Sequence, residues 1–529
     1  MTNAKKKTKA SKPKKNSASF EESLWDSANK LRGSVESSEY KHIVLSLIFL
    51  KFISDKFEKR RQALKEAGQE AFIEMVEFYA SENVFYLAEE ARWDHLMVHS
   101  KQNDIALKID TALHTIEKSN PQLAGALPDN YFSRLGLEVN KLAALLDTIN
   151  NIDTMANECD ISEQDLVGRV YEYFLGKFAA TEGKGGGEFY TPKCVVALLA
   201  EMLEPYKGKI YDPCCGSGGM FVQSIKFVNS HNGSQKDISI YGQEYTNTTY
   251  KLAKMNLAIR GINGNLGDVA GDSFFKDQHQ DLKADFIMAN PPFNQKQWRA
   301  DAELTDDPRW RGYTIPPTGN ANYAWILHML SKLSESGTAG FVLANGSMST
   351  NTSGEGEIRK QLIENDHVDC MIALPGQLFY TTQIPVCLWF LTKNKGEDKT
   401  RGYRNRKGET LFIDARQMGT MASRIHKELT ADDIAKIAQT YHAWRGEAKD
   451  GSYEDVAGYS KSASLEDIKT NDYVLTPGRY VGAAELEDDG IPFEVKMKEL
   501  SQTLCCQMLE AMELDKAIMQ NLEALGYGE

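Results

Sequence analysis

The segment Lys209–Met220, with the sequence KIYDPCCGSGGM, joins a short apolar run to an aspartate and to a turn that contains three glycines. Glycines at 216, 218 and 219 permit a tight turn and let a ligand approach the backbone closely. Asp212 adds a fixed carboxylate at the end of the run. Turns of this kind bind nucleotides in some α/β proteins and are purely structural in others, so this turn alone does not identify a ligand.

Short apolar runs alternate with helical patterns throughout this part of the chain. Each run has the length of a strand, and each helical pattern repeats its apolar residues every three or four positions. This alternation predicts a Rossmann-like α/β domain with a mostly parallel sheet and helices on both faces. The expected strands lie at 209–212, 238–244, 284–290, 340–345, 369–375 and 386–392, and the expected helices include 195–203, 250–260 and 323–333.

Helical patterns dominate the residues in front of this domain. From about Phe20 to Leu175, few strand-like alternations interrupt the helical spacing of apolar residues such as Ile43, Leu47 and Phe52. We therefore expect an N-terminal helical domain. A further apolar stripe at helical spacing follows Pro492 and predicts a terminal helix that packs on the protein itself or on a partner. Its residues are Leu500, Leu504, Met508, Met512, Ile518, Leu522 and Leu525.

These patterns divide the 529 residues into five parts. We expect a disordered basic tail at 1–18, a helical domain at 19–160, an α/β domain at 161–420, an irregular polar region at 421–490 and a C-terminal helix at 491–529. The first fifteen residues carry seven lysines and no acidic residue. Such a run is typical of a solvated tail or of a weak nucleic-acid tether.

The composition limits the partners and the compartment. A formal net charge of −13 argues against binding a long stretch of phosphate backbone unaided. Eight cysteines occur without C-x-x-C or paired histidine spacing, which predicts reduced thiols in the cytoplasm and neither disulfides nor a zinc site. The apolar run at 43–53 contains a lysine and is shorter than a bilayer span, so we expect no membrane segment.

The sequence Met288–Phe293, MANPPF, ends an expected strand with two prolines. Prolines supply no backbone N–H and hold the preceding residue in an extended conformation, so Asn290 is presented rigidly at the end of the strand. Its amide, the neighbouring carbonyl groups and the ring of Phe293 are suited to a flat group that bears an NH₂. Packing in the core is the structural alternative for Phe293.

Acidic residues follow the other expected strands. At the end of the second strand, the Glu244 carboxylate can accept both hydroxyls of a ribose. A solvated strand end is the structural alternative for Glu244. Asp272 is placed for contact with an adenine ring, with Asp268 as its competitor. No Walker lysine follows the glycines and no hydride-transfer site follows them either. A nucleoside cofactor without a phosphate cradle favours S-adenosylmethionine, whose methyl group is activated for transfer.

The glycine turn and the NPPF motif together resemble the cofactor and catalytic motifs of amino-methyltransferases. NPPF also occurs in enzymes that methylate a protein glutamine amide or guanine N2. The order of several further motifs over residues 20–400 is similar to the modification subunit of type I restriction-modification systems. These motifs are LRGSVESSEYKHIVLSLIFLKFISDKF at 31–57, GEFYTP at 187–192, NANYAWILHMLSKL at 320–333 and IALPGQLFYTTQIPVCLWFL at 372–391.

The resemblance implies a site-specific DNA methyltransferase that transfers a methyl group from S-adenosylmethionine to adenine N6. It implies four partners: double-stranded DNA, a specificity subunit, a second copy of this chain and a restriction or translocase subunit. The N-terminal helices and the C-terminal stripe are the candidate contacts. The implied catalytic residues are Asn290, Pro291, Pro292 and Phe293. The implied cofactor residues are Glu188, Phe189, Tyr190, Thr191, Pro192, Lys193, Asp212, Gly216, Ser217, Gly218, Gly219, Glu244 and Asp272.

Several alternatives stay open at this level. The same fold methylates protein glutamine or RNA guanine N2, and a chain that has lost turnover would serve assembly only. Cys214 and Cys215 stand where relatives commonly carry small residues, and we expect them to pack and not to act in redox chemistry. One E-x-K sequence, Glu494–Lys496, is a weak nuclease pattern that lies in a helical stretch.

Overall fold

The computed structural model describes Trp25, residues 37–151, Tyr173 and residues 191–379, 384–423, 426–447, 451–483 and 493–524. The chain forms two compact units, residues 1–482 and residues 483–529, and each is considered by itself below. The predicted basic tail at 1–18 lies outside the described residues.

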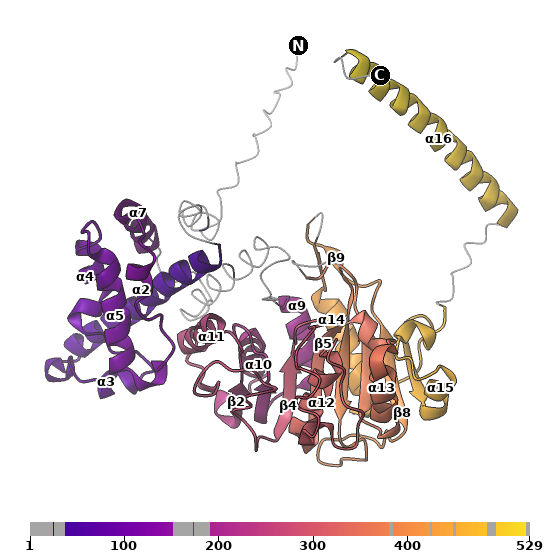
Figure 1. The fold of residues 1–529 in the computed structure, drawn as a ribbon, viewed down its shortest axis with the longest axis horizontal. Helices are drawn as coiled ribbons and strands as arrows, with labels where there is room; N and C mark the ends of the chain where they lie inside the picture. Colours follow the sequence, from indigo (N-terminus) through magenta and orange to yellow (C-terminus); the bar gives the residue numbers. More distant parts are fainter. Residues whose placement is uncertain are drawn as a thin grey trace, which may run out of the picture. The chain divides into compact units, whose positions relative to one another are not determined.

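Helices form the N-terminal part of the first unit, as the sequence predicted. They are α2 (Ser37–Glu66), α3 (Glu77–Ala80), α4 (Trp93–Val98), α5 (Ile105–Ser119), α6 (Tyr131–Arg134) and α7 (Val139–Asn150) (Figure 1). Their apolar faces share one buried core, in which Ile43, Leu47 and Phe52 of α2 are at most 1% exposed. The buried carboxylate of Asp110 accepts the backbone N–H groups of Tyr131, Phe132 and Ser133, so it fixes the start of α6.

Nine strands of the described residues form one sheet, in the order β11-β8-β6-β7-β5-β4-β1-β2-β3. Strand β7 is antiparallel to β5 and β6, and β11 is antiparallel to β8, while the other neighbouring pairs are parallel. The predicted mostly parallel sheet is therefore confirmed. The strands are β1 (Gly208–Asp212), β2 (Ile238–Gly242), β3 (Gly264–Asn265), β4 (Ala284–Ala289), β5 (Leu333–Ala344), β6 (Val368–Ala373), β7 (Val386–Thr392), β8 (Glu409–Asp414) and β11 (Ser460–Ser464).

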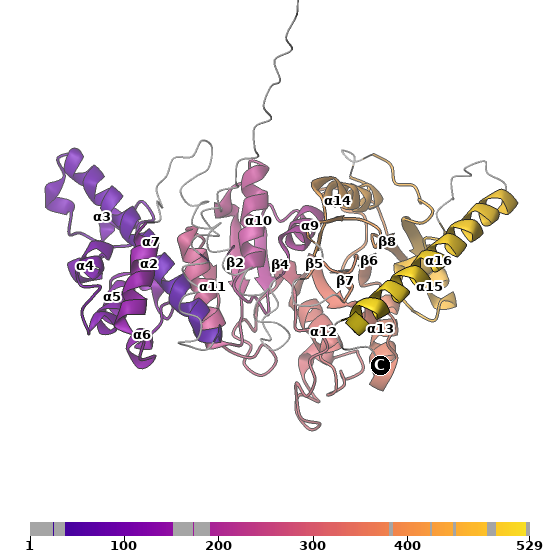
Figure 2. The same ribbon diagram turned by 90° about the horizontal axis from the view of Figure 1, so that it is seen from above.

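Helices cover both faces of this sheet. Figure 2 shows α9 (Lys193–Leu203), α10 (Gly219–Ser230) and α14 (Ala431–Arg445) on one side of the row of strands. It shows α12 (Asn322–Lys332) and α13 (Glu355–Glu364) on the other. In β4, Ile287 belongs to the core of α12 while Met288 belongs to the core of α9, and neither is exposed to solvent. Burial on both faces explains why this strand is continuously apolar from residue 286 to residue 289.

Helix α11 (Asn247–Ile259) joins the α/β part to the helical part. Its residues Leu252, Met255 and Ile259 belong to the core of the N-terminal helices. On the same helix, the Lys251 ammonium donates to the Leu127 carbonyl at 2.7 Å, and that of Lys254 donates to the Ala124 carbonyl at 2.8 Å. The two parts are thus packed together through one shared helix.

The prediction of an irregular region at 421–490 is wrong. This stretch contains α14, β11 and α15 (Leu465–Thr470), and β11 pairs with β8 at the edge of the main sheet. A small hairpin of β9 (Thr420–Met421) and β10 (Lys427–Glu428) precedes α14. Helix α14 begins with a capping box of Thr430 and Asp433 and ends at Gly446 in the left-handed conformation. These local signals mark a helix although its sequence is polar.

The second unit contains one long helix, α16 (Phe493–Ala524), as predicted. The exposed fractions of its apolar stripe lie between 38% and 68%, at Leu500, Leu504, Met508, Met512, Ile518 and Leu522, whereas Leu525 lies outside the described residues. Glu494 and Lys496 of the weak nuclease pattern lie in this helix and not in a strand. Among the helices described, none combines the length and the hydropathy required of a membrane span.

Candidate active site

Asn290 follows the last residue of β4, and Thr191 lies beside it although 99 positions separate them in sequence. The Asn290 side-chain Nδ2 donates to the Thr191 hydroxyl at 3.0 Å. The Oδ1 atom of the same amide is buried and accepts no hydrogen bond from any described residue. A buried acceptor without a donor is costly, so the site is prepared for an N–H group that is supplied from outside.

The residues around Asn290 hold the motif rigidly. Pro291 is buried, and the ring of Phe293 lies 5.9 Å from that of Phe379 in an edge-to-face arrangement. Asn294 and the buried Asn322 exchange hydrogen bonds of 3.0 and 2.9 Å, which tie the end of the motif to the start of α12. Phe379 was not singled out from the sequence, although it belongs to the motif at 372–391.

The glycine turn lies between β1 and α10. Gly216 and Gly218 have φ values of 53° and 79°, a region that favours glycine, and Gly218 caps α10. Among the described residues, no atom lies within 4 Å of a Cβ placed on Gly216 or Gly219, so these residues leave open space beside the turn. Asn256 of α11 donates to the carbonyl of Ser217 at 2.6 Å and holds the turn from behind. The predicted turn is therefore present and accessible.

Asp212 is 2% exposed at the end of β1, and its Oδ1 accepts the backbone N–H of Cys214 at 3.0 Å. Burial raises the pKa of its carboxyl to about 7, against the lowering effect of that hydrogen bond. Burial also raises the pKa values of the Cys214 and Cys215 thiols well above their usual value. Thiols that resist ionisation are poor nucleophiles, in agreement with the predicted packing role.

Glu244 lies just beyond β2, beside the glycine turn. One carboxylate oxygen accepts the backbone N–H of Gly216 at 3.1 Å, and the other accepts that of Thr246 at 2.9 Å. A carboxylate oxygen has about two acceptor positions, a property that suits a group that binds hydroxyls. The contact between Glu244 and Gly216 brings the predicted ribose acid and the predicted cofactor turn together.

Asp272 and Asp268 differ clearly in their surroundings. Asp268 is exposed, whereas Asp272 is partly buried and its Oδ1 accepts the backbone N–H of Phe274 at 2.7 Å. The loop of Asp272 is joined to the rest of the site, because the Gly271 N–H donates to the Glu244 carbonyl and the Ser273 hydroxyl donates to the Pro213 carbonyl. This arrangement favours Asp272 over Asp268.

Gln243 is a site residue that sequence reasoning missed. It is fully buried directly before Glu244, and its amide donates to the carbonyls of Gly271 and Lys276 at 3.1 and 2.7 Å. A buried amide with both donors used fixes the path of the loop between these residues. The only local signal was its place beside an acidic residue at a strand end.

The segment at 188–193 is described only in part. Glu188, Phe189 and Tyr190 lie outside the described residues. Pro192 caps α9, which begins at Lys193. Thr191 was expected at the cofactor, and its hydroxyl accepts a hydrogen bond from the amide of Asn290.

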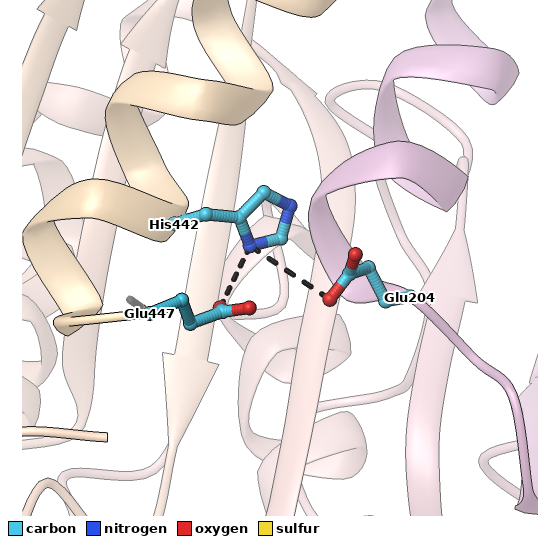
Figure 3. A group of neighbouring side chains, drawn as sticks. All are labelled: Glu204, His442 and Glu447. Carbon is cyan, nitrogen blue, oxygen red and sulfur yellow. Dashed lines mark hydrogen bonds and ion pairs between the residues drawn. The ribbon is translucent and has the colours of Figure 1, made fainter. Parts of the chain in front are cut away.

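A separate polar cluster joins α9 to α14 through Glu204, His442 and Glu447 (Figure 3). His442 Nδ1 lies 2.8 Å from Glu447 and 4.0 Å from Glu204. The buried guanidinium of Arg445 lies 2.5 Å from the Glu447 carboxylate and 3.0 Å from His442 Nδ1. A guanidinium in contact with two of the three ligand atoms fits an ion-pair cluster better than a metal site.

Comparison with protein families finds two matches that together span most of the chain. Residues 162–489 match the N-6 DNA Methylase family, and residues 20–151 match the HsdM N-terminal domain. The methylase match begins before the glycine turn and ends after β11, so it includes the whole sheet.

The individual relatives are methylase subunits of type I restriction enzymes. The type I restriction enzyme HindI methylase subunit of Haemophilus influenzae is 51% identical over 432 residues, which are 81% of this chain and 94% of that protein. The MjaIX methylase subunit of Methanocaldococcus jannaschii is 39% identical over 96% of this chain and 92% of its own length. The structure of a type I methyltransferase subunit from Streptococcus thermophilus has a TM-score of 0.71, at 24% identity, over 88% of this chain and 99% of that one, and shares its fold.

Proposed function

This chain belongs to the N-6 DNA methylase family as the methylase subunit of a type I restriction-modification system, and from that premise we propose that Asn290 holds the adenine amine that becomes methylated. The buried Oδ1 of Asn290, without a donor among the described residues, carries this proposal. Membership in this family favours adenine in DNA over protein glutamine and RNA guanine, and an active enzyme over a silent assembly subunit.

We propose that S-adenosylmethionine binds at the glycine turn. When bound there, it supplies a methyl group activated by a positively charged sulfur. The surroundings fit such a group, because open space adjoins Gly216 and Gly219 and the carboxylates of Asp212 and Glu244 lie beside them. Glu244 would accept the ribose hydroxyls and Asp272 would contact the adenine ring. Ser217 and Gly218 complete the turn, and the segment Glu188–Lys193 would lie over the methionine part.

The proposed chemistry addresses the weak nucleophilicity of an adenine amine, whose lone pair is delocalised into the ring. The Asn290 Oδ1 and the Pro291 carbonyl would each accept one N–H, which localises the lone pair on nitrogen. Alignment with the methyl group can contribute roughly 7–11 kcal/mol to lowering the barrier. A strong general base is not needed, since the proton leaves after positive charge has developed on nitrogen and water can take it.

Phe293 would stack on the adenine after the base has left the helix. Extrusion costs on the order of a few kcal/mol, and stacking on an aromatic ring offsets part of that cost. The edge-to-face contact with the buried Phe379 holds the Phe293 ring in place for this role. The fixed φ of Pro292 restricts the backbone between Asn290 and Phe293.

The proposed partners are double-stranded DNA, a specificity subunit, a second copy of this chain and a restriction or translocase subunit. The exposed apolar stripe of α16 supports a helical contact, since a stripe of that length is normally covered by another surface. The net charge of −13 supports a shared DNA interface in which another subunit contributes basic groups. The cytoplasm is the proposed compartment, because the DNA substrate and the reduced cysteines belong there.

The decisive experiment compares wild type with Asn290→Ala. Labelled S-adenosylmethionine, DNA and the specificity subunit are combined with each protein, and the product is mapped to N6-methyladenine. The substitution is expected to lower kcat by at least about 100-fold, as for other lost polar contacts to developing charge, while calorimetry gives an unchanged cofactor affinity. Undiminished methylation by the variant would remove Asn290 from the proposed role. Robust site-specific methylation by the isolated chain would show that the reaction does not need the specificity subunit.

A further inference from the structure

Arg309 lies in the long segment between β4 and α12, in a 3₁₀ turn at Pro308–Trp310. This segment follows the catalytic motif directly. All five N–H groups of the Arg309 guanidinium have partners, which is the full donor capacity of the side chain. They are the Asp307 carboxylate through Nε and Nη2 at 2.7 and 2.6 Å, the Ser273 carbonyl at 3.0 Å, the Phe274 carbonyl at 2.6 Å and His328 Nδ1 at 3.0 Å.

The two carbonyl partners belong to the loop that carries Asp272. Ser273 and Phe274 come directly after that residue, and a planar guanidinium that bonds both carbonyls fixes the backbone at this point. The same loop is joined to the glycine turn through the Ser273 hydroxyl and to the strand end of Glu244 through Gly271. Arg309 thus ties the loop to the segment following the catalytic motif through hydrogen bonds, beside the ring contact of 4.6 Å between Phe274 and Trp298.

The surroundings of Arg309 allow one orientation of the guanidinium. His328 Nδ1 faces a group that has donors only, so this nitrogen is the acceptor and the ring proton lies on Nε2, toward the Tyr211 hydroxyl at 3.1 Å. Burial, with the Arg309 charge second, lowers the pKa of His328 to about 3 and keeps the ring neutral. The Asp307 carboxylate binds the guanidinium in a bidentate pair, and the Arg309 side chain is 10% exposed.

We propose that Arg309 is a positioning residue that holds the Asp272 loop in the place where the adenine of the cofactor binds. This inference rests on the proposed function, because it takes the glycine turn and Asp272 as the cofactor site. Arg309 touches neither cofactor nor target base in this role. It acts through the backbone of Ser273 and Phe274, and it links the position of that loop to the segment beside Asn290.

Arg309→Lys tests the inference, with Arg299→Lys as the matched control. Lysine has three donors and no planar fork, so it cannot serve two carbonyls, a carboxylate and His328 together. Arg299 lies in the same segment, but its guanidinium bonds only carbonyls of that segment, at Ala300, Asp301, Glu303 and Pro316. Both variants remove an arginine clamp, and only Arg309→Lys releases the Asp272 loop.

Three measurements on the full chain with its specificity subunit distinguish positioning from general stability. Calorimetry with S-adenosylmethionine is expected to give a Kd about tenfold higher for Arg309→Lys, a change equal to about 1.4 kcal/mol, and a Kd within about twofold of wild type for Arg299→Lys. At saturating cofactor, kcat of Arg309→Lys should stay within about threefold of wild type, so that the effect appears in KM. In the protein without cofactor, amide hydrogen exchange at 271–276 should accelerate in Arg309→Lys alone.

Equal Kd values for the two variants would overturn the inference and leave the proposed function intact. If Arg309→Lys does not fold, Asp307→Asn replaces it, because it keeps the guanidinium and removes the carboxylate that orients it. An unchanged Kd in that variant would overturn the inference as well. Failure of wild type to bind S-adenosylmethionine would overturn both proposals. Normal cofactor binding together with undiminished methylation by Asn290→Ala would contradict only the proposed function.

Discussion

Thr191→Val tests how the Asn290 amide is held. Valine has nearly the shape of threonine and lacks the hydroxyl, so the substitution removes the 3.0 Å contact to Asn290 Nδ2 and little else. A hydroxyl can accept or donate, so Thr191 fixes the plane of the amide and not the choice between its two ends. The adenine amine, which offers only N–H groups to this site, then selects the orientation with Oδ1 toward it.

The expected loss follows from this single hydrogen bond. A typical intramolecular hydrogen bond contributes about 0.5–1.5 kcal/mol net, which corresponds to a factor of about 2–12 in the population of the correctly placed amide. We therefore expect kcat of Thr191→Val to fall by about two- to twelvefold. That loss is much smaller than the one expected for Asn290→Ala, because Oδ1 is still present and only its orientation is freed.

The assay is single-turnover methylation of a DNA duplex by the complex with the specificity subunit, at saturating S-adenosylmethionine. Thr191→Ser is the control, since it keeps the hydroxyl and should retain nearly the wild-type rate. Calorimetry of the three proteins gives the cofactor affinity separately, and it should be the same for all of them.

Two results would refute this reasoning. An unchanged methylation rate in Thr191→Val would mean that the amide is held by other contacts. A weaker cofactor affinity with an unchanged rate at saturation would mean that Thr191 serves the cofactor, as its place in the GEFYTP motif predicted.

Raising the pH from 6 to 8 is expected to strengthen cofactor binding with release of a proton, because the pKa of Asp212 is raised to about 7 and a bound cation favours the ionised carboxylate. Calorimetry in two buffers measures the proton, and Asp212→Asn should abolish the trend. Replacing Cys214 and Cys215 by alanine should leave methylation within about twofold of wild type, and complete loss in the labelled-methyl assay would indicate a chemical role. Glu447→Gln leaves the buried Arg445 guanidinium without its carboxylate partner. The free energy of unfolding, measured in urea at pH 7, should therefore fall by about 3 kcal/mol. The control Asp455→Asn removes an exposed ion pair and should lower it by less than about 1 kcal/mol. Since the pKa of Glu447 is lowered from 4.5 to about 2, its contribution should be present above pH 4.5 and lost as the pH falls toward 2, and persistence at pH 2 would contradict this account.

Local pattern determined the class of the fold and the place of the catalytic motif. Strands such as β4 are buried on both faces, so they contain continuous apolar runs, here residues 286–289, that are visible in the sequence. The two prolines after Asn290 end the strand by backbone chemistry that needs no tertiary contact. The glycine turn was equally predictable, because Gly216 and Gly218 adopt positive φ values that other residues disfavour.

The structure of residues 421–490 was predicted wrongly because the spacing of their apolar residues shows little helical or strand periodicity. Helix α14 is polar on much of its surface and buries residues such as Ile437, Tyr441 and Trp444 only against α9 and the sheet. Strand β11, with the sequence SKSAS, has little apolar content and forms by pairing with β8 at the edge. The sequence signals available for α14 were its capping box and the glycine that follows it, and both are local.

The contacts that complete the site depend on the tertiary structure alone. Thr191 reaches Asn290 across 99 positions, and Arg309 reaches Ser273 across 36. Periodicity and turn chemistry report only neighbours within a few residues, whereas these pairs meet because a parallel sheet gathers distant strand ends at one edge. The sequence by itself therefore singled out Asn290 as the proposed contact of the adenine amine, and the folded chain decided which hydroxyl and which guanidinium lie around the proposed site.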